Sequence, residues 1–262
     1  MKYLSYLLAL FMLACNNEEG STANNIAPSK EKQLTDAVKQ FSDSVIMVEN
    51  LAQFYRENGD YEKALSAINN AIKKDSTKTK YWHMKAVLHY ENEDTTQAIA
   101  ALEKSILLSK DLNDILLLAK IYAETKNPDA LALCEILVKQ NKFVKEAVFI
   151  KGTYFKNIND AAKAIIYFDE AISMSYTFME PYGEKAKILY GRQKYMDALI
   201  VLDKAVKIQN NYPEGYFFMG RCFEKLNRWE DAKESYETAL IYDKDYEEAK
   251  EALAKLGPVD KK

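Results

Sequence analysis

The stretch PEGYFFMGRCFEKLNRWEDAKESYETALIYDKDY, residues 213–246, shows most plainly how this chain is organised. Apolar residues recur at helical spacing over 216–223 and again over 232–239. The segment 226–229, Leu-Asn-Arg-Trp, separates the two runs. The stretch therefore predicts two short helices joined by a tight turn.

The same pattern returns along the chain at a step of 34 residues. Ala64 and Ala98 are one step apart, and Ala164, Ala198 and Ala232 follow one another at the same step. A second small residue seven positions later repeats the series in most places, and the residues there are Ala71, Ser105, Leu137, Ala171, Ala205 and Ala239. Small residues at i and i+7 lie on one stripe of a helix, where a neighbouring helix can approach closely.

The pattern resembles the tetratricopeptide signature W-x2-L-G-x2-Y, A-x3-F, A. The matching positions of the last repeat are Tyr216, Met219, Gly220, Phe223, Ala232, Tyr236 and Ala239. Those of the first repeat are Val48, Leu51, Ala52, Tyr55, Ala64, Ile68 and Ala71. The resemblance implies an all-α protein, a right-handed superhelical α-solenoid of about six helix-turn-helix repeats.

The expected division of the chain follows from this period. The repeats are expected at about 45–78, 79–111, 112–144, 145–178, 179–212 and 213–246. A capping helix is expected on each end, at 30–44 and 247–257, because an end repeat would otherwise expose its apolar face, and 258–262 would be a tail. The third repeat is irregular, since its turn at 125–128 is one residue short and ends in a proline.

The N-terminus has the layout of a bacterial lipoprotein leader. Residues 1–14 combine a basic start with a short apolar run, which is too short to span a bilayer, and the ending Met-Leu-Ala-Cys resembles a lipobox. Cys15 would carry the lipid, and 15–29 would be a disordered tether. An ordinary secretory leader is the alternative. The acidic pair at 18–19 resembles export signals of Bacteroidetes lipoproteins, so we expect attachment to the outer membrane, with the periplasmic or surface face left open.

Composition argues against several other classes of function. The 36 basic and 39 acidic residues give a formal charge of -3, which disfavours nucleic acid as a partner. We find no catalytic or phosphate-binding motif, so we predict neither an enzyme nor a cofactor. His83 and His89 would lie on nearly opposite sides of one helix and could not share a metal. Cys134 and Cys222 fall in distant repeats and are expected to be buried free thiols.

The family resemblance also implies a concave groove lined by the first helix of each repeat. The residues that would point into it are His83, Val87, Tyr90, Leu116, Lys120, Phe149, Thr153, Lys156, Lys187, Tyr190, Phe217, Arg221 and Lys225. Aromatic rings with Lys and Arg between them suit a peptide with apolar anchors and some acidic groups. Chaperone-binding members clamp a C-terminal carboxylate with Asn at fixed positions. Here those positions hold no Asn but Gln53, Val87, Lys120, Thr153, Lys187 and Arg221.

Three functional hypotheses follow. The first is a membrane-anchored scaffold that binds a protein or peptide partner in its groove and acts as an adaptor for an envelope assembly or a cell-wall enzyme complex. The second is a lipoprotein that captures a glycan or a small peptide, because aromatic rings stack on sugars. The third is a cytosolic helper protein whose leader has been misassigned.

Overall fold

The computed structural model describes residues 29–257, which form fourteen α-helices and no β-strand. The helices of this part are α1 (Lys30–Gln40), α2 (Val45–Glu57), α3 (Tyr61–Lys74), α4 (Thr79–Glu91), α5 (Thr95–Ser109), α6 (Leu112–Glu124), α7 (Asp129–Lys139), α8 (Val144–Asn157), α9 (Ala161–Met174), α10 (Glu180–Gly191), α11 (Tyr195–Ile208), α12 (Pro213–Lys225), α13 (Trp229–Tyr242) and α14 (Glu247–Leu256). The predicted signal peptide, Cys15, the tether up to residue 28 and the C-terminal tail lie outside the described residues.

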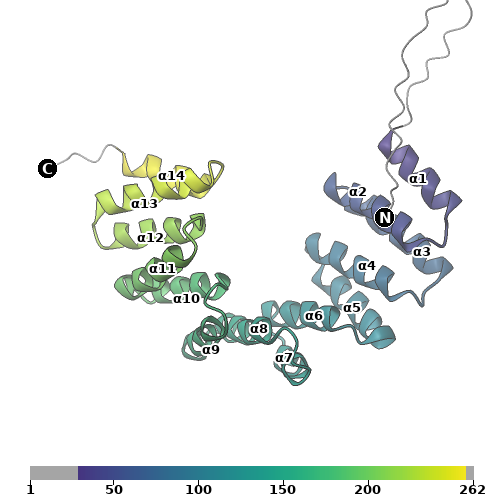
Figure 1. Ribbon diagram of the computed structural model, residues 1–262, viewed down its shortest axis with the longest axis horizontal. Coiled ribbons are helices and arrows are strands. Elements are labelled where there is room, and N and C mark those ends of the chain that lie inside the picture. The colour runs from purple at the N-terminus through teal and green to yellow at the C-terminus, as the bar shows by residue number, and fades with distance from the viewer. Residues whose placement is uncertain (1–28, 258–262) are drawn as a thin grey trace, which may run out of the picture.

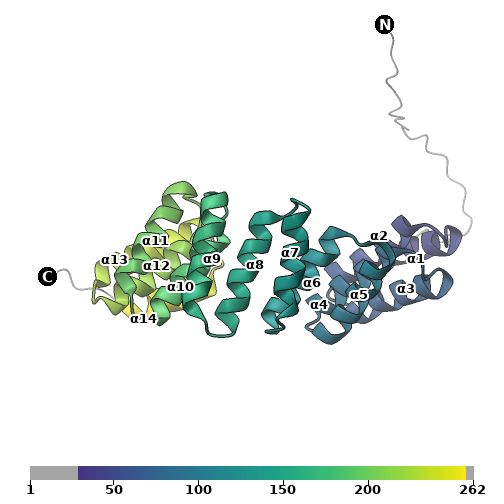
Figure 2. The same cartoon turned by 90° about the horizontal axis from the view of Figure 1, so that it is seen from below.

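The helices stack in chain order into an open arc (Figure 1). Each helix packs on the next one in the sequence, and six antiparallel pairs run from α2–α3 to α12–α13. The first helix of each pair lies on the inner side of the arc. Seen along its edge, the arc is an elongated body with α1 and α14 at opposite ends (Figure 2). The all-α solenoid that the sequence predicts is therefore confirmed.

Every pair closes with the same kind of turn. One residue in each turn has a positive φ, and these residues are Gly59, Glu93, Lys126, Asn159, Gln193 and Asn227. The amide that follows it donates to the carbonyl five residues back, as from Asp60 to Tyr55 at 2.9 Å and from Arg228 to Phe223 at 2.9 Å. This bond pairs a carbonyl of the last helical turn that has no partner within the helix. The repeated turn explains why six pairs keep nearly one period.

In five of the six pairs the residue after the left-handed position is the N-cap of the second helix, whereas in the third pair the N-cap of α7 is Pro128, two residues after Lys126. Asp60, Asp94 and Asp160 are N-caps whose carboxylates accept from the backbone amide three residues later, at 3.0 to 3.1 Å. Lys194 and Arg228 occupy the equivalent places without a side-chain cap bond. The fifth and sixth pairs therefore lack one stabilising contact that their neighbours have.

The core lies between the helices of each pair and its neighbour. The alanines that define the period are completely buried, namely Ala64, Ala98, Ala130, Ala164, Ala198 and Ala232. Large side chains approach small ones across each pair. A Cβ atom on Gly152 of α8 would lie 2.6 Å from Cε1 of Phe168, and one on Gly220 would lie 2.5 Å from Cε1 of Tyr236. Only glycine permits these close approaches.

Cys134 and Cys222 are buried and unpaired, as expected. Burial raises the pKa of the Cys134 thiol to about 12 and that of the Cys222 thiol to about 11. Both are therefore neutral apolar core residues at physiological pH.

No helix between residues 29 and 257 is both long enough and apolar enough to cross a bilayer.

Candidate functional site

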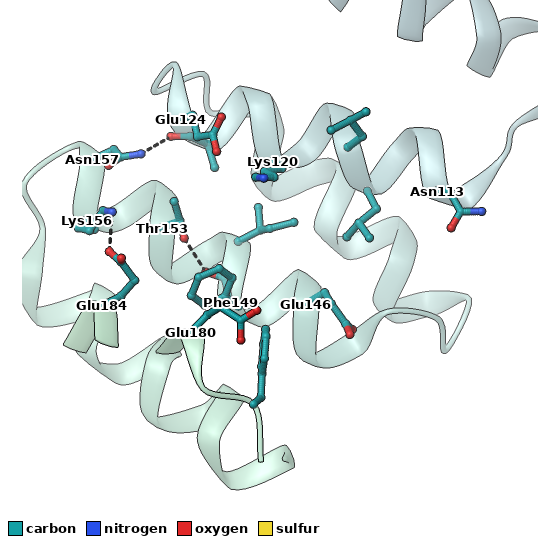
Figure 3. A pocket seen from close by; sticks show the side chains of 15 residues that line it. Asn113, Lys120, Glu124, Glu146, Phe149, Thr153, Lys156, Asn157, Glu180 and Glu184 are labelled. Atoms are coloured by element: carbon teal, nitrogen blue, oxygen red, sulfur yellow. Dashed lines mark hydrogen bonds and ion pairs between the residues drawn. The ribbon is translucent and has the colours of Figure 1, made fainter. Parts of the chain in front are cut away.

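A large hollow lies on the inner side of the arc, where α6, α8 and the start of α10 meet. It has a volume of about 710 Å³ (Figure 3). Its apolar lining residues are Leu116, Leu117, Ala123, Phe149, Ile150 and Phe178. Its polar lining residues are Asn113, Lys120, Glu124, Glu146, Thr153, Lys156, Asn157, Glu180 and Glu184. We call this hollow the central pocket.

Aromatic packing fixes the apolar side of the central pocket. The ring of Phe149 lies 5.5 Å from that of the buried Phe168 and 5.4 Å from that of Phe178, where the second contact is edge-to-face. Such arrangements match the positive edge of one ring to the negative face of another. The Nζ atom of Lys145 lies 5.2 Å from the centre of the Phe178 ring. The Phe149 ring is therefore fixed by its contacts with Phe168 and Phe178, and the rest of its surface faces the pocket.

A three-residue charge network crosses from α8 to α10. Both oxygens of the largely buried Glu184 accept hydrogen bonds, one from Lys156 at 2.7 Å and one from Lys187 at 2.8 Å. Burial raises the pKa of Glu184, but the two lysines outweigh burial and leave that pKa below its usual value. The carboxylate stays ionised, and it neutralises part of the charge of Lys156 and Lys187.

Two more contacts tie the first helices of successive repeats together. Asn157, at the end of α8, donates to the carbonyl of Ala123 at 2.9 Å. Tyr90 donates to the carboxylate of Glu124, and Lys120 lies 5.3 Å from the centre of the Tyr90 ring. These bonds fix the spacing of α4, α6 and α8, and so the width of the central pocket.

A second hollow of about 590 Å³ continues the first along α10 and α12. Phe149, Glu180 and Glu184 line both hollows, which together form one groove. The other residues of this C-terminal pocket are Thr177, Met179, Gly183, Lys187, Gln209, Tyr212, Glu214, Phe218 and Tyr246. We use "the groove" for the central and C-terminal pockets together.

A separate, smaller hollow of about 180 Å³ lies between α2 and α4. His83 is at its edge and hydrogen-bonds through Nδ1 to Asp114 of α6, whose side chain is 3% exposed. This bond raises the pKa of His83, and burial opposes the rise. The charge pair links the second repeat to the third.

Most of the predicted groove residues line one of these hollows. Those that do are His83, Val87, Leu116, Lys120, Phe149, Thr153, Lys156 and Lys187. Tyr90 and Lys225 line none of the three, although Tyr90 holds Glu124. Tyr190 and Arg221 also line none of the three. They contact each other, and the guanidinium carbon of Arg221 lies 4.8 Å from the centre of the Tyr190 ring.

Phe217 is placed differently from what the resemblance implied. It is 9% exposed and packs against Tyr236 and Tyr246 with ring centres 5.8 and 5.1 Å apart. The next residue, Phe218, lines the C-terminal pocket instead. The helical register of α12 thus turns Phe217 into the core.

Several residues that line the groove were not predicted from the sequence. These are Phe178, Phe218 and the glutamates Glu146, Glu180 and Glu214. The three glutamates recur at 34-residue steps, which was a signal that the sequence offered. Phe178 lies in the link between two repeats, where the period gives no guide to side-chain direction.

No group of three or more His, Cys, Asp or Glu among the described residues is arranged to hold a metal ion. Glu184, Lys156 and Lys187 of the groove are paired with one another, Glu180 and Glu214 are exposed, and burial raises the pKa of Tyr212 and Tyr246. Its chemistry is that of a binding surface.

Comparison with solved structures identifies the architecture. A tetratricopeptide repeat protein from Parabacteroides merdae ATCC 43184 has a TM-score of 0.69 with 18% sequence identity, over 87% of this chain and 91% of that one. The family model described as "Tetratricopeptide repeat" matches residues 189–256, and the model described as "Anaphase-promoting complex, cyclosome, subunit 3" matches residues 33–105. The fold is a tetratricopeptide-repeat (TPR) solenoid.

Two proteins are similar to this chain in sequence. Stress-induced-phosphoprotein 1 of Caenorhabditis elegans is 21% identical over 247 residues, which are 81% of this chain and 77% of the relative. Hsp70-Hsp90 organizing protein 3 of Arabidopsis thaliana is 30% identical over 220 residues, which are 80% of this chain but only 38% of the relative. TPR solenoids present an extended concave surface to their partners.

Proposed function

We propose that this protein is a membrane-anchored TPR adaptor that holds a protein or peptide partner in its groove. The observation that carries the proposal is the continuity of the groove. Its two pockets meet at Phe149, Glu180 and Glu184 and run across four successive repeats on the inner side of the arc. An elongated, partly apolar hollow of this size suits a peptide segment better than a compact metabolite.

The proposed partner is not a chaperone of the kind mentioned in the name of the Arabidopsis relative, Hsp70-Hsp90 organizing protein 3. The positions that clamp a C-terminal carboxylate in chaperone-binding members hold no Asn, and two of them, Lys187 and Arg221, already have partners in this chain. The proposed partner is therefore bound through an internal segment. We place it in the cell envelope, in an assembly or a cell-wall enzyme complex.

Crosslinking from inside the groove tests the partner-binding role. A photoreactive amino acid placed at Thr153 or Lys120 should yield the same covalent adduct in living cells. The matched controls are Ile166 and Ile200 of the outer helices α9 and α11, which are 62% and 66% exposed. No adduct from the groove positions, or an equal adduct from the outer ones, would refute the role.

The membrane anchor rests on the leader sequence and needs its own test. Metabolic labelling with a palmitate analogue should mark the wild-type chain and be lost in Cys15→Ser. Cys222→Ser is the control, since a buried thiol should not carry the label. Retained labelling in Cys15→Ser, or none in the wild type, would remove the anchor, and with it the outer-membrane location, while leaving the groove proposal intact.

Glycan capture is less favoured than peptide binding. Trp82 donates its indole N–H to the carbonyl of Ser76 at 2.8 Å, and Trp229 begins the outer helix α13. Neither of these residues, the best sugar-stacking groups of the chain, lines the groove.

A further inference from the structure

The groove carries an excess of negative charge. Five glutamates and three lysines line its two pockets, a net charge of -2. Two of the lysines, Lys156 and Lys187, are already bound to Glu184. The remaining lysine, Lys120, lies over the Tyr90 ring. The charge left to meet a ligand is therefore mainly that of carboxylates.

Three of these carboxylates form a regular row. Glu146, Glu180 and Glu214 occupy the first turns of α8, α10 and α12. Glu180 and Glu214 are exposed and form no hydrogen bond or ion pair with another described residue, and the nearest cation to Glu146 is Lys145 at 3.8 Å. We call these three residues the glutamate row.

Helix stabilisation alone does not account for this placement. A carboxylate in the first turn interacts favourably with the helix dipole wherever on the turn it lies. Asp197 of α11 and Glu230 of α13 are also first-turn acids, yet they do not line the groove. The glutamate row, in contrast, faces the hollow in three successive repeats.

The aromatic rings of the groove are already used to contact cations. Lys145 lies over Phe178, and Lys187 lies 5.5 Å from the centre of the Phe218 ring. Phe149, which lies between the two pockets, has no such cation from its own chain in the described structure. Glu146, Phe149 and Glu180 lie on the same side of the central pocket in Figure 3, away from Glu124 and Asn157.

We propose that the groove binds a basic segment of the partner, with an arginine side chain against Phe149 and its guanidinium paired with Glu146 and Glu180. This inference rests on the proposed function and names the chemistry of the segment bound. Arginine fits better than lysine because its planar guanidinium both stacks on a ring and offers a fork of donors to carboxylates. The segment also carries apolar residues for the remaining lining. This proposal differs from the sequence-based expectation of some acidic groups in the ligand.

Binding of defined peptides tests the proposal. The probes are two fluorescein-labelled peptides of alternating Leu and Arg or alternating Leu and Glu, titrated with the full chain while fluorescence anisotropy is recorded. The Arg peptide should bind and the Glu peptide should not. Binding of the Arg peptide should weaken as salt is raised, because exposed charges are screened.

Glu→Gln variants distinguish binding to the glutamate row from nonspecific electrostatic attraction between the basic peptide and the acidic protein. In the double variant Glu146→Gln/Glu180→Gln the Arg peptide should bind roughly 5-fold more weakly or worse, since each exposed ion pair contributes on the order of a few-fold. Glu230→Gln with Glu237→Gln on α13 removes the same charge from an outer helix and should change little. Thermal unfolding of both variants shows whether the fold is kept.

The outcomes distinguish this inference from the adaptor role. Equal binding of the Arg peptide by the groove variant and the outer-helix variant would overturn the inference. So would an acidic segment identified by sequencing the peptide crosslinked at Thr153, but in that case the adaptor role would stand. A crosslink from the groove to a second copy of this chain would also overturn the proposal that the groove binds a basic segment of a partner.

Discussion

His83 of α4 hydrogen-bonds to the buried carboxylate of Asp114 in α6, and this pair joins two successive repeats. The bond raises the pKa of His83 above its ordinary value of 6.5. A histidine whose pKa is raised by folding stabilises the protein fully below the unfolded pKa, and the contribution is lost as pH rises through the folded pKa. The link between the second and third repeats is therefore stronger in mild acid.

Replacing His83 by Gln should remove this pH-dependent contribution. The difference in the free energy of unfolding between wild type and His83→Gln, measured by urea titration, should be largest below about pH 6.5 and shrink at higher pH. His89→Gln is the internal control, because burial lowers the pKa of His89 and its contribution has the opposite sign. A constant difference from pH 5 to 9 would show that the pair carries no pH-dependent stability.

The left-handed turn residues give a second prediction. Glu93 has a φ of 61°, a conformation that costs a residue with a Cβ atom about 1–2 kcal/mol. Glu93→Gly should stabilise the protein by roughly 0.5–1 kcal/mol, because glycine's extra chain entropy offsets part of the relief. Gly59→Ala, at the equivalent position in the first turn, should destabilise by about 1 kcal/mol. If both variants shift the urea midpoint in the same direction, turn strain is not the cause.

The missing N-cap of α11 can be supplied. Lys194 has φ -86° and ψ 59°, close to the φ -87° and ψ 71° of Asp160, which caps α9. Lys194→Asp should therefore add about 1 kcal/mol of stability, less a small repulsion from Asp197. Asp160→Ala should cost a similar amount. Thermal melts of the two variants would contradict this expectation if Lys194→Asp lowered the midpoint.

The close approach at Gly152 predicts a large local effect. The methyl group of Gly152→Ala would overlap the Phe168 ring and should cost roughly 1–3 kcal/mol. Gly191→Ala is the control, because nothing lies within 4 Å of its added methyl group, and it should be neutral or stabilising. The double variant Gly152→Ala/Phe168→Leu should lose less than the two single variants added together. Additive losses in that cycle would mean that the ring and the methyl group do not meet.

The repeat period predicted the fold well because each position in it has one physical role. Ala164 must be small where two helices touch, and this role leaves a mark in the sequence. The positive φ of the turn does so at Gly59, but not at Glu93 or Gln193. Side-chain direction at the groove is harder to predict. A helix turns by about 100° per residue, so a small error in the assumed register exchanged Phe218 for Phe217.

Charge pairing was not predictable from the same pattern. Glu184 meets Lys156, 28 residues away, because the end of α8 lies beside α10. The sequence shows both residues but not that one cancels the other, which is why the lysines of the groove suggested an acidic ligand. Glu180 and Glu214 lie one period apart, but the sequence does not show that both face the groove.

Each helix of the arc packs mainly on its immediate neighbours in the chain. Such a body is elastic, because a slight rotation at each junction adds up to a change in curvature, and the extensive contacts within residues 29–257 join only helices that are one or two apart in the chain. A ligand that spans the groove would contact α6, α8, α10 and α12, and it would restrict the relative rotation of these helices. Occupancy of the groove would then be visible as mechanical resistance, in single-molecule stretching of the chain, even before the partner is named.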